Sequence, residues 1–275
     1  MSVAFKWKQE NFQKLIDDCP DEPVTPYIFK YFPNPDEEKL LEAGCGSGRY
    51  VYYLNELGYD ITGLELEQET VDTLNDVYPN LDIIQGDVTK LPFDDDSFTG
   101  ILSLGVIEHV IEGMDDPIKE MYRVLQKGGY ALVIVPSFNY IRRIKYALGY
   151  YHLMGLIKYS NFIRKCFNKS PIKYDKNEKI YTSQSRFKHW DVFGRFIEYR
   201  LTKQQFEEEL SKAGFLIIES VPVSLIDGIY HEFGRMFVKY QNLTFYPNQA
   251  GRWLNNTLSK IPFCHNHMHL CVVRK

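Results

Sequence analysis

Short apolar runs alternate with longer amphipathic stretches between residues 39 and 137 of this 275-residue chain. Apolar residues recur every three or four positions in the longer stretches, as Val71 and Leu74 do, which is the spacing of one helix face. The predicted strands are residues 39–43, 60–64, 81–85, 100–104 and 130–135, and the predicted helices are 49–57, 68–78 and 117–125. This alternation is typical of βαβ units that build a parallel sheet, so we expect an α/β fold.

The alternation stops at Asn139, and the stretch from there to about residue 200 is aromatic and basic. We interpret it as a largely helical insertion. The α/β pattern then resumes, with Thr202 as the N-cap of a helix at 203–213, followed by a strand at 215–221. A second irregular segment, 227–262, leads to a final strand at about 267–273. The expected layout is an N-terminal helical segment (1–38), a domain built from 39–138 and 199–275, and an inserted segment (139–198).

Composition places the chain among ordinary globular proteins, with 44% hydrophobic and 25% charged residues. The first 14 residues contain no apolar run that resembles a signal-peptide core, and no stretch approaches the ~18 apolar residues that span a bilayer. The 5 cysteines are scattered and form no CxxC pair, which argues against a disulfide framework or a zinc knuckle. We therefore expect a cytoplasmic protein.

The most informative motif is a strand that runs directly into a glycine-rich turn at residues 40–48, Leu-Leu-Glu-Ala-Gly-Cys-Gly-Ser-Gly. Glycines there let the backbone approach a ligand, and the helix that follows offers unpaired N–H groups. Dinucleotide sites use G-x-G-x-x-G, whereas this turn has Gly44-x-Gly46-x-Gly48, and the lysine of a phosphate-binding P-loop is missing. The carboxylate of Glu42 suits a cationic amino-acid ligand better than a pyrophosphate. The turn therefore favours an amino-acid-bearing nucleoside over NAD.

Two further acidic residues follow the next two strands. Glu65 lies roughly 20 residues beyond the glycine turn, where a carboxylate can accept both hydroxyls of a ribose. Asp87 closes the third strand. Each of these residues alone is more often a solvated strand end or a turn cap. Their joint occurrence in this order favours a nucleoside site.

On these motifs, the chain resembles class I S-adenosylmethionine-dependent methyltransferases, in particular those of the ubiquinone pathway and of other small molecules. The resemblance covers about 39–137 and 199–221. It implies a Rossmann-like, mostly parallel sheet with an antiparallel final strand, S-adenosylmethionine as cofactor and S-adenosylhomocysteine as product. It also implies that the glycine turn wraps the methionine part, that Glu65 binds the ribose, and that Asp87 and the Val88 N–H face the adenine. The implied cofactor-binding residues are Glu42, Gly44, Cys45, Gly46, Gly48, Glu65, Leu66, Asp87, Val88 and Leu104.

The candidate catalytic residues are Glu108 and His109, which follow the fourth strand. Methyl transfer is an in-line displacement that needs alignment and exclusion of water, and an acceptor that carries a proton also needs a base. Some relatives have Glu-x-x-Glu-His at this point and use it with a divalent metal. Because Gly105 stands at the first acidic position, we expect no metal here.

The inserted segment differs from the rest of the chain in charge and in aromatic content. Residues 139–203 hold 15 Lys and Arg against 4 Asp and Glu, although the whole chain has a net charge of -4. Their 14 aromatic residues lie among these cations, which suits a lid over a small or conjugated anionic acceptor. A sequence pI near 6.0 argues against nucleic acid. Two other interpretations remain. Residues 140–167 could contact a membrane surface, or the aromatic residues could form a small core of the insertion itself.

Two alternatives stay open. The first is a non-catalytic module that binds S-adenosylmethionine and regulates or scaffolds a partner, in place of an enzyme that methylates O, N or C. The second concerns the histidines of residues 265–269, which could bind a metal or, at His265, touch substrate, although packing is more typical. A dehydrogenase is disfavoured by the glycine spacing.

Overall fold

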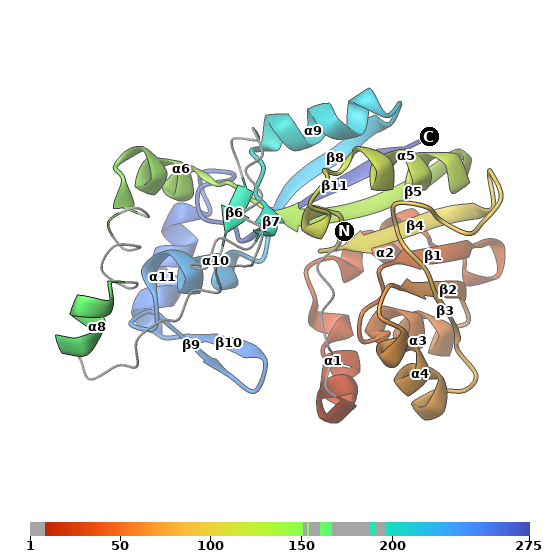
Figure 1. The fold of residues 1–275 in the computed structure, drawn as a ribbon, viewed down its shortest axis with the longest axis horizontal. Coiled ribbons are helices and arrows are strands. Elements are labelled where there is room, and N and C mark those ends of the chain that lie inside the picture. The colour runs from red at the N-terminus through yellow and green to blue at the C-terminus, as the bar shows by residue number, and fades with distance from the viewer. Residues whose placement is uncertain (1–8, 151–152, 154–159, 167–187, 191–195) are drawn as a thin grey trace.

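The structure is a computed structural model that describes residues 9–150, 153, 160–166, 188–190 and 196–275. Its centre is one seven-stranded sheet with the strand order β3-β2-β1-β4-β5-β11-β8 (Figure 1). The strands are β1 (Lys39–Ala43), β2 (Asp60–Glu65), β3 (Asp82–Gln85), β4 (Phe98–Leu104), β5 (Leu125–Pro136), β8 (Leu216–Val223) and β11 (Met268–Arg274). Strands β1 to β5 pair in parallel, and β11 is antiparallel to both β5 and β8. The expected α/β sheet with an antiparallel final strand is confirmed.

Helices cover both faces of the sheet (Figure 1). One face packs against α1 (Phe12–Asp17), α2 (Thr25–Tyr31), α3 (Arg49–Glu56) and α4 (Gln68–Val77), through core residues such as Ile28, Leu54 and Leu74. The other face packs against α5 (Asp115–Val124) and α9 (Lys203–Lys212), through residues such as Met121 and Phe206. Short 3-10 helices are η1 (Gln9–Asn11), η2 (Cys19–Asp21), η3 (Pro35–Glu37) and η4 (Ile107–His109).

The start of α9 was predicted correctly from the local sequence, and the start of β5 was not. Helix α9 begins after Thr202, as expected, because the Thr202 hydroxyl and the Gln205 side chain form a capping box. By contrast, β5 begins at Leu125, five residues before its predicted start, and continues through Gly128 and Gly129. A Cβ at Gly129 would lie 2.5 Å from the Thr99 carbonyl oxygen. Gly129 therefore permits the close approach of β5 to β4.

The segment 227–262, predicted to be irregular, is regular. It contains α10 (Leu225–Phe233), the hairpin β9 (Val238–Gln241) and β10 (Thr244–Pro247), and α11 (Gln249–Leu258). Asn242 and Leu243 turn the hairpin with φ angles of 49° and 62°. A leucine with positive φ gives no sequence signal for a turn, and this explains why the pattern was missed.

The described part of the insertion contains α6 (Tyr140–Ala147), α8 (Asn161–Cys166) and the antiparallel strands β6 (Lys188–Trp190) and β7 (Phe196–Tyr199). The expectation of a largely helical insertion thus omitted a pair of strands. Helices α6, α8, α10 and α11 and the β9–β10 hairpin are all drawn to the left of the large sheet in Figure 1, and Lys145 of α6 forms an ion pair with Glu232 of α10. We call the described residues of 139–166, together with 225–263, the peripheral lobe. No helix in the described part of the chain is long and apolar enough to cross a membrane.

Candidate functional site

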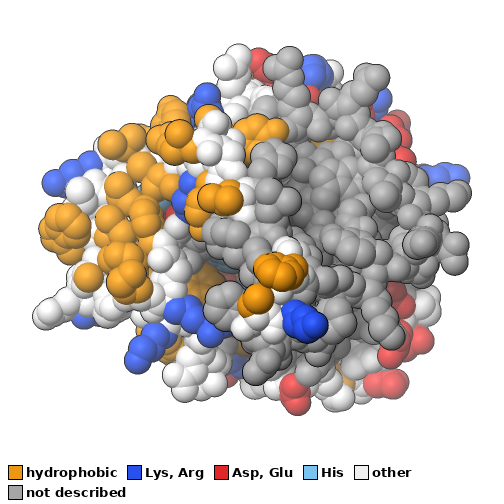
Figure 2. Space-filling model, turned by 60° about the vertical axis from the view of Figure 1, so that its left-hand side comes forward, with side chains coloured by type: hydrophobic (Ala, Val, Ile, Leu, Met, Phe, Trp, Pro, Cys, Tyr) orange, Lys and Arg blue, Asp and Glu red, His pale blue; other side chains and the backbone are white. Residues whose placement is uncertain are grey.

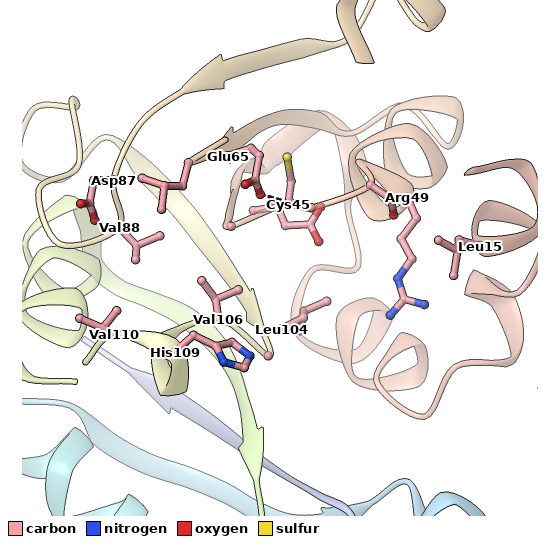
Figure 3. Close-up of a pocket in the computed structure, with 16 residues that line it drawn as sticks. Leu15, Cys45, Arg49, Glu65, Asp87, Val88, Leu104, Val106, His109 and Val110 are labelled. Carbon is pink, nitrogen blue, oxygen red and sulfur yellow. Dashed lines mark hydrogen bonds between the residues drawn. The ribbon is translucent and has the colours of Figure 1, made fainter. Parts of the chain in front are cut away.

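A cavity of about 230 Å³ opens at the carboxyl ends of β1, β2 and β4. This is the edge where the strand order reverses, and open α/β sheets bind their ligands there. Figure 3 shows the side chains that face the cavity from successive strand ends. It is lined by Leu15, Glu42, Gly44, Cys45, Gly46, Ser47, Arg49, Glu65, Leu66, Asp87, Val88, Leu104, Gly105, Val106, His109 and Val110. The structure therefore brings Glu42, Glu65 and Asp87 around one hollow.

The glycine turn forms one wall of this cavity. The Gly44 and Cys45 N–H groups both donate to the Leu64 carbonyl oxygen, over 2.8 and 2.9 Å, which ties the turn to β2. Gly44 has a φ of +86°, and a Cβ there would lie 2.5 Å from Val106 Cγ1. Gly48 lies outside the cavity: it is the N-cap of α3, with a φ of +69°. Its role in the structure is to start α3.

Glu42 is a buried carboxyl whose Oε2 has no hydrogen-bond partner. Burial raises the pKa of Glu42 to about 8, although the nearby Arg49 guanidinium opposes the shift. Leaving such a group unsatisfied is costly, and a cationic donor in the cavity would satisfy it. The site therefore fits a ligand that carries an ammonium group.

Arg49, which sequence reasoning missed, lies beside Glu42 on the cavity wall. It is the first residue of α3, and its Nη1 forms an ion pair with Glu22 Oε1 over 2.9 Å. Together with Leu15 of α1, it closes the end of the cavity opposite Asp87 (Figure 3). The signal in the sequence was a cation directly after the glycine turn, where its remaining N–H donors can meet a ligand carboxylate.

Glu65 and Asp87 are held in place by backbone donors. Glu65 Oε2 accepts from the Gly46 N–H over 2.9 Å, and its Oε1 accepts from the Glu67 N–H over 3.0 Å. Asp87 Oδ1 accepts from both the N–H and the hydroxyl of Thr89, each over 2.8 Å. Since a carboxylate has about four lone-pair sites, both groups keep capacity for ligand hydroxyls or amines. Their orientation is thus fixed before a ligand binds.

The two candidate catalytic residues have different surroundings. His109 lies on the cavity wall, whereas Glu108 is buried beneath it and does not line the cavity. Burial raises the pKa of Glu108 well above its usual range, which favours the neutral form of this carboxyl. Glu108 Oε1 is 3.7 Å from His109 Nε2, and its Oε2 has no hydrogen-bond partner. Strand β7 packs against η4 and covers this side.

The histidines of residues 265–269 do not gather around one point. His265 Nε2 donates to Asn255 Oδ1 over 2.9 Å, and His269 Nε2 lies 2.8 Å from the Ser220 hydroxyl. His267 Nδ1 lies 2.6 Å from Arg142 Nη2. Because each imidazole has a separate partner, the alternation of histidines along the strand does not build a metal site.

One other group in the described part of the chain could offer metal ligands: Asp227, His231 and His267, whose ligand atoms lie within 4.8 Å of one another. Burial lowers the pKa of His267 to about 3, so its ring is neutral. Arg142 donates to Nδ1, which leaves the ring proton on Nε2, the atom that faces Asp227 over 4.0 Å. A metal would need a lone pair at that nitrogen. The group therefore does not suit a metal ion.

Comparison with known proteins identifies the part of the chain that builds the cavity. Residues 41–133 match a family model described as a methyltransferase domain. A demethylmenaquinone methyltransferase of Chlorobaculum tepidum is 31% identical over 50% of this chain and 56% of its own length. A phthiotriol/phenolphthiotriol dimycocerosates methyltransferase of Mycobacterium tuberculosis is 31% identical over 46% of this chain and 50% of its own length. The chain thus spans about half the length of these curated relatives.

Solved structures resemble the chain over nearly its whole length. An S-adenosylmethionine-dependent methyltransferase from Mesorhizobium loti superposes with a TM-score of 0.54 at 15% identity, covering 94% of this chain and 100% of that one. A cyclase superposes with a TM-score of 0.51 at 16% identity, covering 92% of this chain and 79% of that one. Such distant likeness shows the fold, and the fold alone does not fix the reaction.

Proposed function

Since the chain carries a methyltransferase domain of the class I S-adenosylmethionine-dependent family, we propose that it transfers a methyl group from S-adenosylmethionine to O, N or C of a small or conjugated acceptor. The observation that carries this proposal is the single cavity in which Glu42, Glu65 and Asp87 meet. The family indicates S-adenosylmethionine as the cofactor, and the side chains of the cavity fit this molecule. When bound, the cofactor provides the electrophilic methyl group.

Each part of S-adenosylmethionine has its own binding residues in this proposal. Glu42 Oε2, which has no partner, accepts from the ammonium group of the methionine part. Arg49 donates to its carboxylate. Glu65 accepts the ribose hydroxyls, and Asp87 accepts the adenine amino group beside Val88. The glycine turn allows the backbone to approach the methionine part, and Cys45, Leu66 and Leu104 complete the wall.

His109 is the proposed base for an acceptor that must lose a proton. It is the one of the two candidate catalytic residues that lines the cavity. Glu108 is buried, its Oε1 is 3.7 Å from His109 Nε2, and it acts as a positioning residue. General base catalysis of this kind contributes typically 10²–10⁴-fold to a rate.

The proposed acceptor carries an anionic group together with an apolar part. A second cavity, of about 310 Å³, lies at the end of β5 and the start of α9, with Arg143, Lys203 and Glu207 among its lining residues. Lys203 pairs with Glu207, so Arg143 provides the excess positive charge. Two relatives are named for demethylmenaquinone and for phthiotriol dimycocerosates. The proposed acceptors therefore include lipid-soluble molecules.

Methyl transfer from tritiated S-adenosylmethionine to a panel of acceptors tests the proposal. The panel includes carboxylated and phosphorylated aromatics, neutral analogues of the same compounds, and demethylmenaquinone. Catalytic label transfer that His109→Ala slows by about 10²–10⁴, while S-adenosylhomocysteine still binds, supports an enzyme. Binding of S-adenosylhomocysteine without transfer to any acceptor would favour the non-catalytic module. A thermal shift with NAD and none with S-adenosylmethionine would refute both.

A further inference from the structure

Exposed hydrophobic side chains concentrate on the peripheral lobe. Of the 16 large hydrophobic side chains that are exposed in the described part of the chain, 12 belong to this lobe. Leu148 is 79% exposed, Phe162 76%, Met236 76% and Trp253 68%. Figure 2, which brings the lobe side of the molecule forward, shows hydrophobic side chains gathered in its left half, with Lys and Arg among them. Contiguous exposed apolar surface of this kind marks interaction sites.

The exposed charged side chains of the lobe are all positive. Residues 139–166 contain no Asp or Glu, and residues 225–263 contain only Asp227 and Glu232. Neither of these two acids is exposed, and Glu232 forms ion pairs with Arg142 and Lys145. The exposed cations of the described lobe are Arg143, Lys165, Arg235, Lys239, Arg252 and Lys260. The lobe therefore presents apolar and positively charged groups without exposed acids.

Helix α6, in the first segment of the lobe, is bonded to the second segment. The Tyr140 and Ile141 N–H groups donate to carbonyl oxygens of residues 263 and 264, over 3.0 and 3.1 Å. The buried guanidinium of Arg142 bonds to Glu232 Oε1 over 2.6 Å and to the Ser137 carbonyl oxygen over 2.5 Å. These buried bonds fix α6 against α10. The exposed surface is thus preformed on parts of the chain that are far apart in sequence.

We propose that this lobe docks onto the surface of an anionic lipid bilayer. Charge complementarity selects this occupant, because the exposed cations match acidic headgroups and no exposed acid opposes them. Trp253 and the exposed tyrosines have the amphipathic shape that settles at the boundary of headgroups and acyl chains. The contact is peripheral, with side chains such as Ile144 and Trp253 inserted at the interface. It adds the segment 225–263 to the membrane contact predicted for 140–167.

Vesicle co-sedimentation tests the docking without any cofactor. The purified chain is mixed with vesicles of phosphatidylcholine alone, or with about one-third phosphatidylglycerol, at low and high salt. We expect partitioning into anionic vesicles to be at least about tenfold stronger than into neutral ones, and to weaken as salt rises. Equal binding to both vesicle types, or binding to neither, would overturn the proposal.

Surface variants locate the contact. Ile144→Ser with Trp253→Ser, and separately Arg252→Glu with Lys260→Glu, should each reduce partitioning about tenfold or more. Leu216→Ser, 63% exposed at the edge strand β8, is the matched control and should bind like the unaltered chain. All of these positions are exposed, so the Tm of each variant should equal that of the unaltered chain. Calorimetry with S-adenosylhomocysteine checks that the separate cofactor site is intact.

Two results would refute the assignment of the surface. One is that the lobe variants and the Leu216→Ser control partition alike. The other is a dimer, measured by light scattering, that the lobe variants dissociate, because a second copy of the chain would then cover this face. Loss of cofactor binding with intact vesicle binding would instead refute only the proposed function.

Discussion

Binding of S-adenosylhomocysteine should strengthen as pH rises from 6 to 8, because Glu42 must lose a proton to bind the ammonium group. The pKa of Glu42 in the ligand-free protein is about 8, owing to its burial. Only the carboxylate attracts the ammonium strongly, and the amino group of the ligand remains protonated over this range. Binding below pH 8 is therefore coupled to proton release.

The size of this effect follows from the pKa. For a group that titrates at about 8, the ionised fraction is about 1% at pH 6 and about half at pH 8, so the Kd should fall roughly 50-fold between them. At pH 7, about 0.9 proton should leave per ligand bound. Isothermal calorimetry in two buffers of different ionisation enthalpy measures both quantities. Glu42→Gln should bind more weakly at pH 8 and lose the pH dependence.

The same ionisation affects stability in the opposite direction. The folded-state pKa of Glu42 lies above the value of 4.5 for an ordinary glutamate, so the ligand-free protein loses stability as pH rises from about 4.5 to 8. Glu42→Gln should therefore raise the Tm at pH 8 and change it little at pH 4. A Kd that is the same within twofold at pH 6 and 8, or an equal slope in Glu42→Gln, would refute this reasoning.

Three further substitutions have defined outcomes. Gly44→Ala should weaken S-adenosylhomocysteine binding at least about tenfold, because its Cβ would lie 2.5 Å from Val106 Cγ1 at a φ of +86°; unchanged calorimetry would contradict this. His109→Ala should lower kcat by about 10²–10⁴ with S-adenosylhomocysteine affinity within threefold, as single-turnover assays can check. Arg142→Met should cost about 3 kcal/mol in urea unfolding, because Glu232 loses a buried partner, and adding Glu232→Leu should recover part of the loss.

The sheet and most of the cavity could be predicted because their signals are local. The glycine turn fixes where β1 ends and α3 begins, and parallel strands bring their carboxyl ends to one edge. Glu65 and Asp87, at the ends of neighbouring strands, had to face the same side. The order of the elements along the chain is therefore enough to place these residues.

The remaining features depend on contacts between distant segments. Arg49 turns toward the cavity because Glu22, from the N-terminal segment, pairs with it. Glu108 is buried because β7, nearly 90 residues later in the chain, packs over η4. Glu108 and His109 are adjacent in one turn but differ in exposure. The spacing of residues along the sequence does not predict this difference. The peripheral lobe likewise combines segments that the sequence presents separately.

A crystal structure of the chain with S-adenosylhomocysteine would show whether the three carboxylates bind one ligand. We expect the ligand amine within hydrogen-bonding distance of Glu42 Oε2, the ribose hydroxyls on Glu65 and the adenine amino group on Asp87. A ligand in the opposite orientation, or bound outside this cavity, would contradict this expectation.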